Sequence, residues 1–161
     1  MASSEISVRI AGLNDLSDIK ELFVNSIRET CRNDYSKEQI DKWCLSVENT
    51  ERWRNYILQQ YFLVAIMNDK IVGFASLENS GCLHLLYVHC QFQNKGIAGI
   101  LLAGIEKEAV KKDFSIICSE VSITARPFFE KKGFIVKKEK IKLIGKVEIM
   151  NFIMEKKIKK T

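Results

Sequence analysis

The sequence predicts a single mixed α/β domain, of the α+β kind, in which short strands alternate with amphipathic helices. The chain has 161 residues, a length at which about 70% of the unfolded chain's surface can be buried in one core. Apolar residues recur at every second position in some segments, as in strands, and at every third or fourth in others, as in helices. No linker or internal repeat divides the chain. One domain is therefore expected over residues 1–161, with flexible ends at residues 1–4 and 157–161.

The first half of the chain predicts one strand, three helical segments and a hairpin. Residues 6–10 alternate as in a strand, and Asn14 or Asp15 caps the helix that follows. Ser36 and Gln39 form a capping box for a second helix, and a third helical stretch lies around residues 53–58. Residues 61–67 and 70–77 are apolar, β-rich runs joined by an Asn-Asp turn, which indicates a hairpin.

The second half predicts strands and helices in alternation, closed by another hairpin. A strand at residues 82–88 precedes a long helix at residues 96–111, in which Gly104 indicates close packing against a neighbouring element. A strand at residues 115–121 and a short helix at residues 124–132 follow, and Gly133 ends that helix. Residues 134–143 and 147–154 pair across Gly145. The order β-α-α-β-β-β-α-β-α-β-β is that of a mixed domain.

Composition bears on location and on metal binding. The longest apolar runs, residues 97–105 and 61–67, are shorter than the roughly 20 residues that a membrane helix needs, and the start of the chain lacks a signal-type apolar segment. A cytoplasmic protein without a membrane partner is expected. Five cysteines, none spaced as C-x-x-C, indicate reduced thiols rather than disulfides. Cys82, His84, His89 and Cys90 do not have the spacing of a four-ligand zinc set, so no metal is expected.

Charge leaves two interpretations open. The formal net charge is +5, with lysines concentrated in residues 137–146 and 156–160. Such lysines are typical of a solvated surface, and they are also compatible with attraction to nucleic acid or to a phosphorylated cofactor. Because no nucleic-acid reader motif accompanies them, a nucleic-acid-binding module is the less favoured reading.

Residues 93–98, QNKGIA, form a polar turn between a strand and a helix that starts at a glycine. The free N–H groups and the dipole of a helix N-terminus suit a phosphate or pyrophosphate. Gly96 lets the backbone approach an anion, Ala98 keeps the next turn uncrowded, and Lys95 adds a positive charge. The hexamer matches neither the nucleotide P-loop nor the dinucleotide fingerprint. A tight structural turn needs the same glycine, so both interpretations stay open on these residues alone.

Two blocks of the sequence resemble signatures of the GNAT acetyltransferase superfamily. Val88, Gln93, Gly96 and Ala98 fit V-x-x-x-x-[QR]-x-x-G-x-[GA], and residues 125–134, ARPFFEKKGF, are similar to A-x-x-F-Y-x-x-x-G-F. Residues 34–43 look like those of a small single-domain bacterial branch. The resemblance covers nearly the whole chain. It implies a mostly antiparallel central sheet with splayed parallel strands and flanking helices, and it implies acetyl-CoA-dependent N-acetyltransferase activity.

The resemblance also implies where acetyl-CoA binds. Its pyrophosphate would accept hydrogen bonds from the backbone amides of the 93–98 loop, and its pantetheine arm would pair with the backbone of a splayed strand. Phe128 and Phe129 would pack near the arm, although ordinary core packing accounts for them equally. The implied cofactor-binding residues are Leu86, Val88, Gln93, Asn94, Lys95, Gly96, Ile97, Ala98, Phe128 and Phe129.

Acetyl transfer to an amine benefits from a general base with a pKa near neutrality, and histidine is the natural candidate. The run LHLLYVH, residues 83–89, is similar to that of arylalkylamine N-acetyltransferases, in which a histidine at the place of His84 is a proposed base. A hydrogen-bonded structural histidine is the alternative. Phe129 stands where the family often has a tyrosine that protonates the leaving thiolate. Tyr87, Ser122, Cys118 or water would then replace that tyrosine.

The expected acceptor is a primary amine of a small molecule or peptide, acetylated directly in a ternary complex by a monomer or homodimer. An acetyl-cysteine intermediate on Cys90 is the less favoured route. Asp34 and Tyr35 would orient a cationic or aromatic amine if they face the cleft. Because Phe129 stands in place of the usual proton-donating tyrosine, an alternative interpretation is a non-catalytic sensor that binds acyl-CoA.

Overall fold

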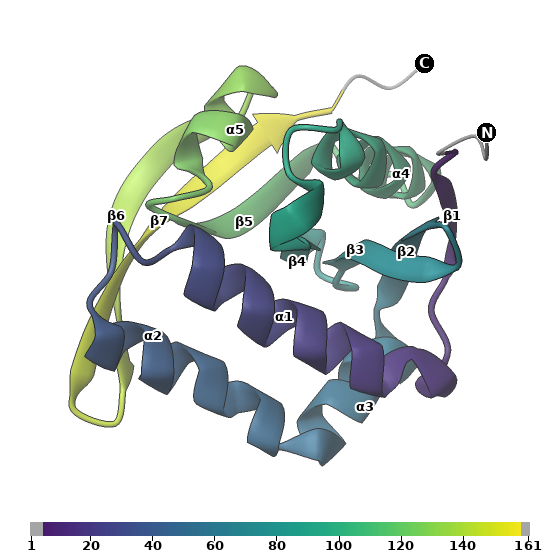
Figure 1. Ribbon diagram of the computed structural model, residues 1–161. Helices are drawn as coiled ribbons and strands as arrows, with labels where there is room; N and C mark the ends of the chain where they lie inside the picture. The colour runs from purple at the N-terminus through teal and green to yellow at the C-terminus, as the bar shows by residue number, and fades with distance from the viewer. Residues whose placement is uncertain (1–4, 159–161) are drawn as a thin grey trace.

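The computed structural model describes residues 5–158, whose strands form one seven-stranded sheet in the order β1-β2-β3-β4-β5-β7-β6 (Figure 1). Within the described sheet only β4 and β5 run parallel, so the predicted mixed, mostly antiparallel sheet is confirmed. The strands are β1 (Ser7–Ile10), β2 (Tyr61–Met67), β3 (Lys70–Leu77), β4 (Cys82–Val88), β5 (Ile116–Ser122), β6 (Ile135–Ile144) and β7 (Val147–Lys157). The helices are α1 (Leu16–Thr30), α2 (Lys37–Cys44), α3 (Thr50–Gln59), α4 (Ile97–Lys111) and α5 (Arg126–Lys131).

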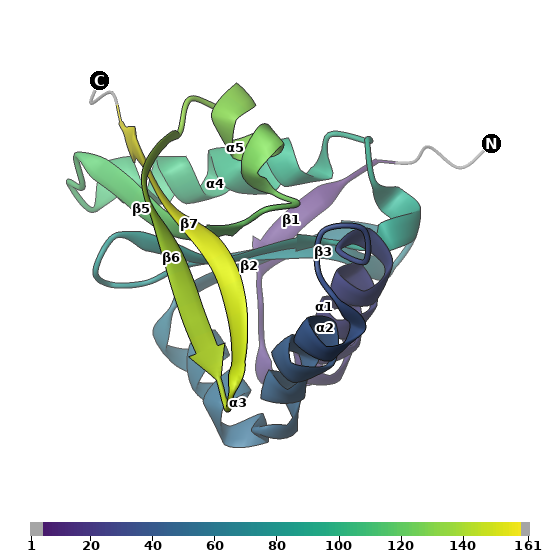
Figure 2. The ribbon, with the colours of Figure 1, turned by 90° about the vertical axis from the view of Figure 1, so that its left-hand side faces the viewer.

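Helices cover both faces of the sheet. Helices α1, α2 and α3 pack on one face, and α4 and α5 pack on the other (Figure 2). Each layer has its own hydrophobic cluster, one built around Phe23, Trp53 and Phe74 and the other around Leu101 and Ile105 of α4. Burying a large apolar side chain stabilises the fold by roughly 1.5–3 kcal/mol, so the two clusters hold the helices firmly on the sheet.

Local sequence signals explain several of these elements. The Ser36 and Gln39 side chains form the predicted capping box at the start of α2. Asn68 and Asp69 both adopt positive φ angles, 51° and 62°, in the predicted β2–β3 turn. A Cβ atom at Gly104 of α4 would lie 2.8 Å from a methyl carbon of Leu63, which confirms the predicted close packing.

Three sequence predictions, at the chain ends and at α5, compare differently with the structure. Residues 1–4 and 159–161, expected to be flexible, lie outside the described residues. Lys157, also expected in the flexible end, is the last residue of β7. Helix α5 is shorter than the predicted 124–132 segment, because Thr124 donates a hydrogen bond to Asp34 and the Ala125 N–H donates to Ser122 Oγ before the helix starts.

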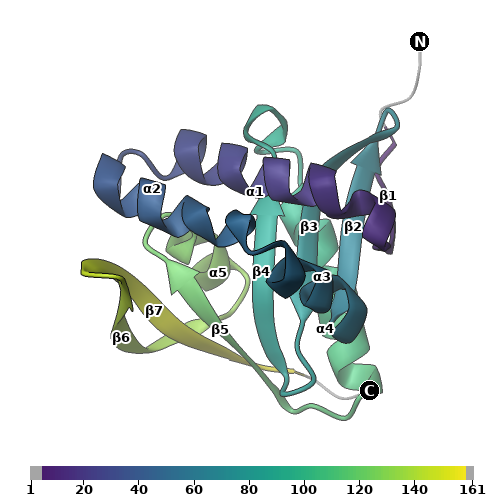
Figure 3. The same cartoon turned by 90° about the horizontal axis from the view of Figure 1, so that it is seen from below.

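The parallel strands β4 and β5 stay together over a short distance only. Cys82 pairs with Cys118 and Leu83 with Ser119, and Ser119 Oγ donates a hydrogen bond to the Leu83 carbonyl. Beyond these pairs the strands diverge, as Figure 3 shows from below. The predicted splay between parallel strands is therefore confirmed. It leaves the following stretch of β4 without a strand neighbour on that side.

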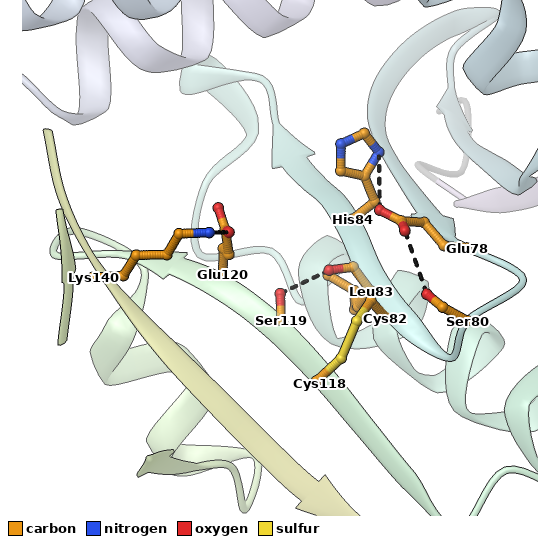
Figure 4. Close-up of a disulfide and its surroundings, with 9 residues drawn as sticks. All are labelled: Glu78, Ser80, Cys82, Leu83, His84, Cys118, Ser119, Glu120 and Lys140. Carbon is orange, nitrogen blue, oxygen red and sulfur yellow. Dashed lines mark hydrogen bonds and ion pairs between the residues drawn. A yellow bond between two sulfur atoms is a disulfide. The ribbon is translucent and has the colours of Figure 1, made fainter. Parts of the chain in front are cut away.

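A disulfide joins Cys82 to Cys118 at the closed end of the splay (Figure 4). The prediction that all five cysteines are reduced thiols is therefore wrong. The bond forms because the parallel register brings the two Cα atoms to 4.6 Å. Cys31, Cys44 and Cys90 are free.

Candidate active site

A cleft of about 1900 Å³ follows the opening between β4 and β5 and connects two regions on opposite faces of the sheet. One region, the α4 arm, is lined by the start of α4 and by α5. The other, the His84 arm, lies between α3 and β4 on one side and β5, β6 and β7 on the other. Nearly all of the predicted site residues line this cleft. They are His84, Leu86, Tyr87, Val88, Gln93, Asn94, Gly96, Ile97, Ala98, Ser122, Phe128 and Phe129.

The start of α4 presents unused backbone donors to the cleft. Gly96, the N-cap residue, has a φ of 80°, and no side chain caps the helix. The Ile100 N–H closes the first helical bond on the Gly96 carbonyl, which leaves the N–H groups of Ile97, Ala98 and Gly99 at the free end. Space is open around Gly96, where an added Cβ would meet nothing within 4 Å. The arrangement suits an anionic ligand.

The remaining loop residues have different roles. Gln93 donates a 2.8 Å hydrogen bond from its side-chain amide to the Val88 carbonyl, which ties the loop to the end of β4. Asn94 has a φ of 61° and continues the turn. Lys95 is exposed and is not among the residues that line the cleft. The loop therefore presents backbone groups to the cleft, with Gln93 fixing its shape.

Helix α5 forms the other wall of the α4 arm. Phe129 is 4% exposed and packs against Phe134 in the core, whereas Phe128 is half-buried beside the cleft. Sequence reasoning missed Lys132, which caps the C-terminus of α5. Its Nζ reaches within 3.3 Å of the Cβ position at Gly99, so the ammonium lies at the free end of α4. A charged residue just before Gly133 was the only signal.

His84 is held by α3 and by the loop before β4. The side-chain amide of Gln60 lies 3.0 Å from His84 Nδ1, and the Tyr56 ring packs edge-on against the imidazole. Glu78 Oε1 lies 3.9 Å from the same nitrogen. In Figure 4 the other ring nitrogen, Nε2, lies on the side away from Glu78. Burial lowers the pKa of His84 below its usual value, and Glu78 partly offsets this effect. His84 is therefore neutral at neutral pH and able to accept a proton.

The candidate proton donors differ in whether they have a proton that they can donate. The Tyr87 ring packs against Phe23 and Phe74, and burial raises the pKa of its phenol, which makes it a weaker acid. Cys118 has no thiol proton because it is in the disulfide, so the prediction that it can donate one is wrong. Ser122 accepts a hydrogen bond from the Ala125 N–H and keeps its own hydroxyl proton.

Two predicted acceptor-orienting residues do not line the cleft. Tyr35 is 5% exposed, donates to the Met150 carbonyl and accepts from the Ile123 N–H. The Asp34 carboxylate accepts from the Thr124 hydroxyl. Both side chains join the α1–α2 connection to the segment before α5, which is a structural role.

Over residues 5–158 no group of three His, Cys, Asp or Glu side chains is placed to hold a metal ion. Within the same range no helix is long and apolar enough to cross a membrane.

A wedge between parallel strands, with free helix amides at one end and a neutral histidine at the other, defines an acyl-CoA-dependent transferase site. Residues 31–153 match the family model of the acetyltransferase (GNAT) domain. The chain belongs to the GNAT acetyltransferase family. It is an acetyltransferase that uses acetyl-CoA as co-substrate.

Two relatives are similar over nearly their whole length. The chain is 31% identical to the uncharacterized N-acetyltransferase YafP of Escherichia coli K12, over 96% of this chain and 97% of that protein. It is 27% identical to spermidine N(1)-acetyltransferase of Thermoplasma acidophilum, over 94% of this chain and 97% of that protein.

Two solved structures are similar in fold. A GCN5-related N-acetyltransferase of Rhodopseudomonas palustris superposes with a TM-score of 0.92, at 27% identity and 98% coverage of both chains. The PaiA N-acetyltransferase of Thermoplasma acidophilum, solved in complex with coenzyme A, superposes with a TM-score of 0.79, at 27% identity, over 95% of this chain and 99% of that one.

Proposed function

We propose that the protein transfers the acetyl group of acetyl-CoA directly to a primary amine of a small molecule or peptide, within a ternary complex. The observation that carries the proposal is the continuous cleft, whose two arms meet at the splay of β4 and β5. Two substrates entering by separate arms meet there without a covalent intermediate. Cys90 is not among the residues that line the cleft, which disfavours an acetyl-cysteine route.

In this proposal the α4 arm binds the co-substrate. The free amides of Ile97, Ala98 and Gly99 receive its pyrophosphate, and Lys132 adds a charge-assisted contact. Asn94, Gly96 and Gln93 shape that loop, while Lys95 contributes only a distant positive charge. The backbone of Leu86 and Val88 lies on the diverging part of β4, where a strand-like ligand arm replaces the missing neighbour. The Val88 carbonyl already accepts from Gln93. Phe128 flanks the arm, and Phe129 supports Phe128 from the core.

His84 acts in the proposal as the general base. When Nδ1 donates to Gln60 Oε1, at 3.2 Å, Nε2 is left free to take the proton of the incoming ammonium. Glu78 stabilises the imidazolium that results. The Tyr87 phenol, whose pKa is raised by burial, and the Ser122 hydroxyl are both weaker acids than a free thiol, whose pKa is about 8.5. The released thiolate therefore takes its proton from the solvent.

The proposal is tested by measuring acetyl-CoA binding calorimetrically and screening an amine panel for acetylated products by mass spectrometry. Binding with turnover of at least one amine is expected. Binding without any product would favour the acyl-CoA sensor, and absence of binding would exclude both the acetyltransferase and the sensor.

His84→Gln should lower kcat about 100-fold or more while leaving the acetyl-CoA dissociation constant unchanged. Because burial lowers the pKa of His84, the acidic limb of kcat/KM should lie below about pH 6.5 and vanish in the variant. His89→Gln is the matched control, since His89 is not among the residues that line the cleft and contacts Gln91, Cys90 and Phe92 beside the loop. Equal losses in both variants, or an unchanged pH profile, would count against a base role.

We also propose a cytoplasmic location, because acetyl-CoA is a charged co-substrate that does not cross membranes unaided. Cell fractionation tests this, and a purely extracellular pool would contradict it. A monomer or homodimer is proposed as well. Strand β6 is a sheet edge with exposed Ile141 and Leu143, the kind of edge through which sheets pair. Light scattering of the purified protein distinguishes the two states.

A further inference from the structure

Positively charged side chains predominate on one wall of the His84 arm. Lys138, Lys140 and Lys142 alternate along β6 and pair with Ile153, Asn151 and Ile149 of β7, so they share the face that turns toward the cleft. Glu139, which also lines the cleft, is on the opposite face of β6, paired with Phe152. One wall of the arm is therefore a row of three lysines.

Two of the three carboxylates that line this arm have a partner, and the third, Glu139, lies on the opposite face of β6. Glu120 of β5 forms an ion pair with Lys140, and Glu78 lies beside His84 and accepts from Ser80 (Figure 4). Lys138 and Lys142, in contrast, form no ion pair with any residue between 5 and 158, and neither does Arg52 on the α3 side. Three cationic side chains thus face the arm without an anionic partner in the described chain.

Lys142 is placed to act on the same ligand as His84. Both line the cleft from opposite walls, and the Lys142 ammonium is close enough to the imidazole to contribute to lowering the pKa of His84. The Nε2 atom lies on the side of the ring away from Glu78 (Figure 4) and forms no hydrogen bond with any of residues 5–158, and His84 lines the cleft. An amine at that nitrogen would extend its remaining atoms toward β6 and its lysines.

We propose, on the basis of the proposed function, that the acceptor is an amine that also carries an anionic group, as an amino acid does. Its amine is received at His84 Nε2 and its anion by Lys142, with Lys138 and Arg52 adding positive potential. A polyamine would meet the unpaired ammonium groups of β6 and be repelled. Of the two carboxylates that would attract a polyamine, Glu120 is paired with Lys140, and Glu78 is outnumbered by the three unpaired cationic side chains of the arm.

The test compares acceptors that differ only in the second charged group. With saturating acetyl-CoA, kcat/KM is measured for phenylalanine against phenethylamine, for lysine against cadaverine, and for β-alanine against 2-aminoethylphosphonate. The first two pairs ask whether an anion is preferred, and the third distinguishes carboxylate from phosphonate. Spermidine is included as a polycationic acceptor. The expected result is a kcat/KM about tenfold higher for the anionic member of each of the first two pairs.

Lys142→Gln should reduce that preference about tenfold, and Lys142→Arg should retain most of it. Lys146→Gln is the matched control, because Lys146 lies in the β6–β7 turn and is not among the cleft-lining residues. Acetyl-CoA affinity, measured for each variant, confirms that the fold is intact. Equal or greater activity on phenethylamine, cadaverine or spermidine would overturn the inference while leaving the proposed function standing. Loss of preference in Lys146→Gln as well would also overturn it. No product from any amine would instead overturn the proposed function, and the inference with it.

Discussion

Tyr35→Phe should destabilise the protein more than removal of one hydroxyl suggests. The hydroxyl sits between two backbone groups far apart in the sequence, donating 2.7 Å to the Met150 carbonyl and accepting 2.9 Å from the Ile123 N–H. The variant keeps the buried ring and its edge-on contact with Trp43, so packing is preserved. It leaves one backbone acceptor and one backbone donor without their partner.

Each buried group left without a hydrogen bond costs about 1–3 kcal/mol. For two such groups, with some relief by water, a loss of about 2–3 kcal/mol in the free energy of unfolding is expected. At a urea dependence of roughly 2 kcal/mol per molar, the unfolding midpoint should fall by about 1–1.5 M. The assay is urea unfolding followed by circular dichroism and by tryptophan fluorescence.

Tyr61→Phe is the matched control. Tyr61 is a half-buried tyrosine of β2 whose hydroxyl bonds to none of the residues 5–158, so its midpoint should move by less than about 0.3 M, in keeping with a surface change of at most ±0.5 kcal/mol. If Tyr35→Phe shifts the midpoint no more than Tyr61→Phe, the two hydrogen bonds do not join β7 to the segment before α5 as described. The reasoning would then be refuted.

Three further predictions concern the α4 arm and the disulfide. Gly96→Ala should lower the free energy of unfolding by about 1–2 kcal/mol because an alanine is strained at a φ of 80°, and Gly96→Asn should lower it less. Thermal melts that rank the two variants the other way would contradict this. Lys132→Gln should weaken acetyl-CoA binding about threefold to tenfold and make the binding less dependent on salt. Lys131→Gln, on an exposed part of α5, should leave both the affinity and its salt dependence unchanged. Calorimetry at two ionic strengths checks both variants. Cys82→Ser should lower the free energy of unfolding by about 4 kcal/mol, from the loop entropy of a 36-residue separation; thiol labelling of both cysteines in the native, unreduced protein would show instead that no bond forms.

Elements whose pattern is local were predictable from the sequence, and contacts between distant segments were not. Strand β4 has the predicted bounds because its apolar residues mark both ends. The turn at Gly96 was predictable because a glycine between a strand and a helix readily adopts the positive φ angle that such a turn needs. The partners of His84 were not, since Gln60 directly follows α3 and Glu78 belongs to the β3–β4 loop, and neither fits a local motif.

The errors have the same origin. The parallel register of β4 and β5 places Cys82 beside Cys118, although 36 residues separate them in the chain. Tyr35 was expected to orient an amine only if it faced the cleft, and the sequence left that open. Its hydroxyl instead meets backbone groups of Ile123 and Met150, on segments that only the folded sheet brings near.

The bond between Cys82 and Cys118 also makes part of the chain a closed covalent ring. Residues 82–118 form that ring, and it contains the 93–98 loop and the whole of α4. A protease that cuts once inside the ring opens it without dividing the molecule, so the two pieces migrate together on a gel until a reductant is added. A cut outside the ring separates the pieces at once. Limited proteolysis on gels run with and without reductant therefore reports where the loop opens.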